Sequence, residues 1–180
     1  MTEPGRRLAD DHSAIDEVLQ ELKTALEFSD VETSHAKLDL FWARLAVHIR
    51  AEHLHLFPTV ITAVREKEAT GLALDEAEAT VAQLCDDHNF FMHELAEAIQ
   101  TIRGKLSDKL MDLDGLKKVQ SAVLEIERRL VRHNELEENK VYRWAGIVLN
   151  EQEQVDLAKN IERELANRPP RFSPEVWQHS

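Results

Sequence analysis

The chain has 180 residues, 31% of them charged, and a formal net charge of −12, which favours one acidic globular domain and disfavours a nucleic-acid partner. It has a single cysteine, so an intrachain disulfide and a cysteine-rich zinc or iron–sulfur site are excluded. The sequence has neither a long uncharged apolar run nor an apolar N-terminal segment, so we expect a cytoplasmic protein without a membrane partner.

Four long stretches in which apolar residues recur every three or four positions predict α-helices, each with one buried face. They run from Leu8 to Leu26, Leu38 to Val64, Leu74 to Ile102 and Leu116 to Val148. A shorter stretch from Val155 to Leu165 predicts a fifth helix. We expect an all-α fold: an antiparallel up-down four-helix bundle with this appended helix in residues 1–166, and an irregular tail in 167–180. Pro58 is expected to kink or interrupt the second helix about one turn past Glu52.

A histidine interrupts the apolar face of each long stretch. The four are His12, His48, His88 and His133. Glu52 and Glu137 each follow a histidine by four residues, a spacing that turns about 40° around a helix and rises roughly 6 Å. Both carboxylates should therefore lie on the same buried face as their histidines.

These motifs also form an internal repeat. The corresponding segments are Asp11-His12 and Asp87-His88, His48-x-x-x-Glu52 and His133-x-x-x-Glu137, and Phe57 and Tyr142. The repeat predicts two helical hairpins of one plan, packed face to face with pseudo-two-fold symmetry and with four histidines at one level. Tyr142 itself is most simply a core residue.

Four imidazoles and two carboxylates in one buried layer would each cost several kcal/mol if they stayed unpaired. A single histidine on an apolar face is usually a hydrogen-bonded core residue, but six such residues in a repeat favour a pair of cations. Nitrogen and oxygen donors without thiolate favour iron or manganese, with zinc still open. The predicted metal ligands are His12, His48, Glu52, His88, His133 and Glu137.

Over roughly residues 8–150, the chain resembles the hemerythrin-like (HHE cation-binding) domain family. The motifs that carry the resemblance are His12, His48-x-x-x-Glu52 followed by Leu56-Phe57-Pro58, His88, and His133-x-x-x-Glu137-Glu138. The resemblance implies a non-haem di-iron site bridged by two carboxylates and an oxo or hydroxo group. It also implies dioxygen, nitric oxide or peroxide as the ligand.

The chain departs from the family's oxygen carriers, which have another histidine where this chain has Met92. The missing histidine favours peroxide, nitric oxide or oxidase chemistry over simple reversible oxygenation. His55 lies close to His48 around the helix, so it could bind a metal or orient Glu52, or merely fill a gap near the proline. His53 is expected to point away from the buried face into solvent.

Several functions stay open. The first is binding of dioxygen, nitric oxide or peroxide for sensing, storage or detoxification. The second is a di-iron enzyme with peroxidase, catalase-like or oxidase activity, and the third is iron storage or iron–sulfur cluster repair. A metal-free helical interaction protein would leave the buried polar layer unexplained. The sequence identifies no organic substrate, and a protein partner or homodimer remains possible.

Overall fold

The computed structural model describes residues 2–66, 71–107 and 113–169. These residues are helical apart from short connections and contain no strand. The elements are α1 (Glu3–Glu27), α2 (Val31–Ala51), η1 (Glu52–Leu56), α3 (Phe57–Glu66), α4 (Leu74–Ser107), α5 (Leu113–Leu136), η3 (Glu137–Val141), α6 (Tyr142–Val148) and α7 (Glu151–Ala166). The predicted all-α class is confirmed. The predicted tail begins without regular structure at 167–169, and 170–180 lie outside the described residues.

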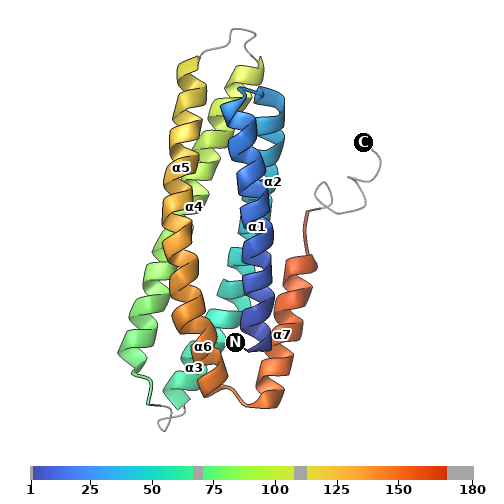
Figure 1. Cartoon of the computed structure of the whole chain (residues 1–180). Coiled ribbons are helices and arrows are strands. Elements are labelled where there is room, and N and C mark those ends of the chain that lie inside the picture. Colours follow the sequence, from blue (N-terminus) through green and yellow to red (C-terminus); the bar gives the residue numbers. More distant parts are fainter. Residues whose placement is uncertain (1, 67–70, 108–112, 170–180) are drawn as a thin grey trace.

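The long helices lie side by side (Figure 1). Helix α1 packs against α2 and α5, and α4 packs against the same two helices. Helix α7 lies along the outside of this group, against α1 and α2. Among the described residues, no helix is long and apolar enough to cross a membrane.

The apolar core is divided into two clusters along the helices. Going along α1, Leu8 belongs to one cluster and Ile15 to the other, and His12 lies between them in the chain. On α4, Leu84 and Phe91 flank His88 in the same way. Burial of such large apolar side chains stabilises the fold by about 1.5–3 kcal/mol each. The histidines therefore occupy a polar layer with an apolar cluster on each side.

A π-helical turn follows α2 and another follows α5. In η1 the backbone N–H of Phe57 donates to the carbonyl of Glu52, and in η3 that of Tyr142 donates to Glu137. Such turns insert an extra residue into a helix and often mark functional sites. The π-helical turn occupies Glu52–Leu56, directly before Phe57 and Pro58, so the second helix is interrupted beside the proline, slightly earlier than expected. Proline is not its general cause, because Arg143 occupies the position that corresponds to Pro58.

Candidate metal centre

The six predicted ligands come together in one buried layer. Each is at most 5% exposed. They come from four segments that are distant in sequence: His12 from α1, His48 from α2 with Glu52 from η1, His88 from α4, and His133 from α5 with Glu137 from η3. Helical packing thus concentrates every nitrogen and oxygen donor of the predicted set in one place.

The histidines form two pairs. The Nε2 atoms of His12 and His48 lie 3.1 Å apart, and those of His88 and His133 lie 3.0 Å apart. Donor atoms within 4.8 Å of one another make up two groups that share Glu137. We call the first group position one (His12, His48 and Glu137) and the second position two (Glu52, His88, His133 and Glu137).

Glu52 extends between the two pairs. Its Oε1 lies 3.6 Å from Nε2 of His48, and its Oε2 lies 3.4 Å from Nε2 of His88. One carboxylate oxygen therefore faces each imidazole pair, which is the arrangement that a bridging carboxylate requires.

Glu137 is placed in the same way from the opposite side. Its Oε2 is 3.2 Å from Nε2 of His12, and its Oε1 is 3.1 Å from Nε2 of His133. Oε1 of Glu137 and Oε2 of Glu52 are buried, and the only polar atoms beside them among the described residues are Nε2 of His133 and of His88, which donate only when protonated. A buried carboxylate oxygen without a donor is costly, and a cation at position two would remove that cost.

An aspartate orients His48 from the neighbouring helix. Nδ1 of His48 donates to Oδ2 of Asp11 at 3.0 Å, while Arg44 lies 3.4 Å from the other oxygen of that carboxylate. Burial raises the pKa of Asp11, but the bond to His48 and the charges of His48 and Arg44 outweigh it, so the pKa is lowered. Such a carboxylate fixes the ring of a metal-binding histidine and leaves Nε2 free for the ion.

The same arrangement recurs around His133. Its Nδ1 lies 3.3 Å from Oδ2 of Asp87, and Arg129 donates to the other oxygen. Neither arginine is among the residues predicted from the sequence, although each precedes its histidine by four residues. The longer pattern Arg-x-x-x-His-x-x-x-Glu, present twice, was the signal that could have identified them.

The other two histidines have different partners at Nδ1. Oε1 of Glu138 lies 3.1 Å from Nδ1 of His12, and Nε2 of His53 lies 2.9 Å from Nδ1 of His88. His53 is exposed, as expected, but the expectation that it points away from the buried face was wrong, because its ring contacts a candidate ligand. No spacing along the chain predicts this contact, because it crosses from η1 to α4.

Three of the candidate histidines thus have a carboxylate beside Nδ1, and the fourth, His88, has the ring nitrogen of His53 there. A neutral imidazole that donates from Nδ1 carries a lone pair on Nε2. The paired Nε2 atoms would then repel each other unless a proton or a metal ion lies between them and the carboxylates. The donor set therefore fits a pair of cations.

Without a metal ion, protons provide this compensation. Burial lowers the pKa of His48, but Glu52 and Asp11 raise it more, so it lies well above its ordinary value. The pKa of His133 is also raised, because Glu137 outweighs burial. Burial raises the pKa of Glu52, yet His48 and His88 hold it well below the usual range. Metal binding at this layer must accordingly displace protons.

Tyr142 is a further component of the layer. Its hydroxyl lies 3.1 Å from Oε1 of Glu52, 3.3 Å from Oε2 of Glu137 and 3.2 Å from Nε2 of His12. Burial and the charges of the two glutamates raise the pKa of Tyr142 well above its ordinary value, so the phenol keeps its proton and donates. In a regular helix Tyr142 would lie about 180° around from His133, and the π-helical turn brings it to the site.

Phe57 is the counterpart of Tyr142 at the other imidazole pair. Its ring stacks on His88 with centroids 6.0 Å apart, as the ring of Tyr142 stacks on His12 at 5.9 Å. Only one of these two aromatic rings carries a hydroxyl. The two positions are therefore alike in their histidines but different in their surroundings.

The remaining sequence candidate, His55, lies elsewhere. His55 belongs to neither donor group, and its Nε2 lies 3.9 Å from a carboxylate oxygen of Glu164 in α7. The same π-helical turn that includes Glu52 alters the rotation of His55 relative to His48. His93 is exposed and lies beside Glu97, 3.4 Å away.

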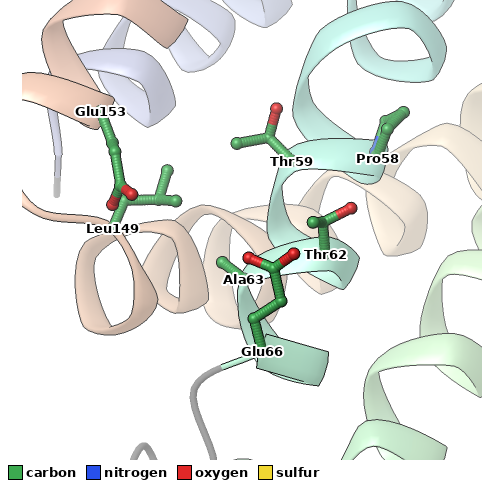
Figure 2. A pocket seen from close by; sticks show the side chains of 7 residues that line it. All are labelled: Pro58, Thr59, Thr62, Ala63, Glu66, Leu149 and Glu153. Atoms are coloured by element: carbon green, nitrogen blue, oxygen red, sulfur yellow. The ribbon is translucent and has the colours of Figure 1, made fainter.

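Two surface hollows lie near the layer. Figure 2 shows one of about 320 Å³, between α3 and the connection from α6 to α7, and it contains none of the candidate ligands. Glu153, which lines it, accepts a hydrogen bond from the backbone of Asn150. The other, of about 470 Å³, lies between α2 and α4, is mainly apolar and includes His53 and Met92. Only this second hollow adjoins a residue that contacts the candidate ligands.

No family model, curated protein or solved structure matches this chain. The buried histidine and glutamate groups could hold metal ions at two adjacent positions.

Proposed function

We propose that this chain is a non-haem di-iron protein of the hemerythrin-like type, which binds dioxygen, nitric oxide or peroxide. The observation that carries the proposal is the placement of the two glutamates, each with one oxygen beside each histidine pair. In this proposal the hairpins α1–α2 and α4–α5 are the two halves of an antiparallel four-helix bundle with a pseudo-two-fold repeat. Helix α7 is then the appended helix.

The donor set supports iron. Position one has two imidazoles and one carboxylate, and position two has two of each. Nitrogen with oxygen ligation suits iron, with manganese and zinc as competitors. Two iron ions, when bound, would supply the redox chemistry and coordination positions that remain open to an exogenous ligand. Six protein side chains shared between two ions leave such positions at both.

The surrounding residues are suited to a small, uncharged ligand. Apolar clusters on both sides of the layer exclude water from it. The hollow between α2 and α4 is mainly apolar and reaches His53, which contacts His88. Dioxygen and nitric oxide are themselves apolar, so this hollow suits their approach better than that of an anion.

The alternative function is a di-iron enzyme with peroxidase, catalase-like or oxidase activity. One observation favours it: the protonated hydroxyl of Tyr142 lies within 3.3 Å of both glutamates. A phenol in that place can hold a proton at the site of the chemistry, which peroxide turnover needs. Iron storage and iron–sulfur cluster repair have no comparable support from the described residues.

Iron content after anaerobic reconstitution tests the proposal. The wild-type chain should retain about two iron ions, and His48→Ala should lose most of them. His93→Ala is a matched control, because His93 lies on the surface and its replacement should leave the iron content unchanged. Fewer than about one iron per wild-type chain, or an unchanged content in His48→Ala, would refute the metal centre.

Absorption spectroscopy separates the two functions. A charge-transfer band that forms on oxygenation and disappears on removal of oxygen would support reversible binding. Irreversible oxidation of the iron together with sustained peroxide consumption would support the enzyme. If the iron-loaded protein shows neither response, both functions are contradicted.

A further inference from the structure

The two positions differ in which carboxylate oxygens are already engaged. The oxygens that face position one, Oε1 of Glu52 and Oε2 of Glu137, lie 3.1 Å and 3.3 Å from the hydroxyl of Tyr142. The oxygens that face position two, Oε2 of Glu52 and Oε1 of Glu137, have only Nε2 of His88 and of His133 beside them among the described residues. The one proton of the phenol is thus shared between the two oxygens at position one, and no hydroxyl engages those at position two.

The hydroxyl of Tyr142 also reaches a histidine of position one, because it lies 3.2 Å from Nε2 of His12. It therefore competes with an incoming cation for donors at position one. At position two, the corresponding ring is that of Phe57, which stacks on His88 and has no hydroxyl. Position two also gathers four donor side chains, whereas position one gathers three.

We propose that the two positions fill in order, with the first cation at position two. The second cation enters position one only when the Tyr142 hydroxyl gives up its bonds to the two glutamates. Tyr142 is thus a positioning residue that sets the affinity of one metal position and leaves the other unaffected. This inference rests on the proposed two-metal function and adds the order of loading to it.

The charge of Glu138 opposes this order of loading, because it favours a cation at position one. Glu138 lies beside His12 and favours a cation at position one, whereas the neutral ring of His53 occupies the corresponding place beside His88. The side chain of Glu138 is 38% exposed, so solvent screens its charge. The bonds from Tyr142 are fully buried and reach charged acceptors directly, so they dominate.

Titration of the metal-free protein with Co²⁺, followed by visible absorption and calorimetry, tests the order. The wild type should bind in two steps, with the second about tenfold or more weaker, because the phenol must first release its charged acceptors. Tyr142→Phe keeps the ring and should tighten the second step by about tenfold with no change in the first. The mirror variant Phe57→Tyr should weaken the first step.

Two histidine variants assign the steps to positions. His12→Gln should weaken or abolish the second step only, and His133→Gln should weaken the first. Helix content from circular dichroism shows whether each variant is folded. Tyr142→Phe and Phe57→Tyr each differ from the wild type by one oxygen atom. They therefore still test the order of loading if a histidine variant fails to fold.

Each outcome decides one proposal. Two equivalents bound in a single step, an unchanged second step in Tyr142→Phe, or a first step that depends on His12 would overturn the order of loading while leaving the two-metal site intact. A wild type that binds less than about one equivalent would instead refute the proposed function itself.

Discussion

Asp11 accepts a hydrogen bond from Nδ1 of His48, 3.0 Å away on the neighbouring helix. The aspartate lies next to His12 in the chain, but the histidine that it orients comes from α2. Asp87 has the same relation to His133. In each hairpin, the aspartate on the first helix therefore orients the ring of the candidate ligand on the second helix.

Replacement of these aspartates should weaken metal binding. Asp11→Asn keeps the shape of the side chain but removes the charge that favours donation from Nδ1 of His48. We expect a loss of about 10- to 100-fold in metal affinity, measured by competition with a chromophoric chelator. Asp87→Asn should cause a similar loss.

Asp10→Asn provides the matched control for the aspartate prediction. Asp10 is 67% exposed and lies near Arg6, away from the layer, so its replacement should leave metal affinity unchanged. An equal effect of Asp10→Asn and Asp11→Asn would mean that overall charge, and not the orientation of His48, controls binding.

Metal removal should destabilise the fold. A cation that binds only the native state stabilises it by about 2.7 kcal/mol when its free concentration is a hundred times its Kd. For a chain of this size that energy corresponds to roughly 5–10 °C in Tm. Calorimetric scans with Fe²⁺ under anaerobic conditions and with a chelator should show this difference, and His48→Ala should show little or none.

The metal-free protein should lose stability as the pH rises. The folded-state pKa values of His48 and His133 lie above the ordinary value, so their contribution is complete below about pH 6.5, the unfolded value, and is lost as pH passes the folded values. We expect Tm in chelator to fall as the pH rises from about 6.5 through the folded-state pKa values. His48→Gln should flatten this dependence.

Metal-loaded protein should respond to pH in the opposite sense over the same window. The ion needs deprotonated histidines, so metal affinity, and with it the gain in Tm on adding metal, should increase with pH. A gain in Tm that is constant across the window would show that binding releases no protons, contrary to the raised pKa values of His48 and His133.

Replacement of His55 should leave metal stoichiometry unchanged. Its ring faces Glu164 of α7 and lies outside both donor groups. His55→Ala should retain the wild-type iron content, while stability should change by less than about 1 kcal/mol, as is usual for an ion pair near the surface. Iron analysis and thermal unfolding check the two parts, and a loss of iron would restore His55 as a candidate ligand.

The sequence by itself was enough to predict the all-α class, the approximate positions of the long helical stretches and the six buried donors. All three follow from local spacing: apolar residues every three or four positions define a buried face, and a histidine or glutamate in that register must lie on it. Glu52 and His48 share a face because they are four residues apart on one helix, whatever the rest of the chain does.

Only the tertiary structure decided which residues surround those donors. The contacts of Asp11 with His48 and of His53 with His88 cross between helices, and no spacing along the chain encodes them. The π-helical turns place Tyr142 against the glutamates and His55 against Glu164, because one extra residue per turn changes the rotation of everything beyond it. The difference between the two metal positions therefore depends on backbone hydrogen-bond register and helix packing, which local periodicity does not determine.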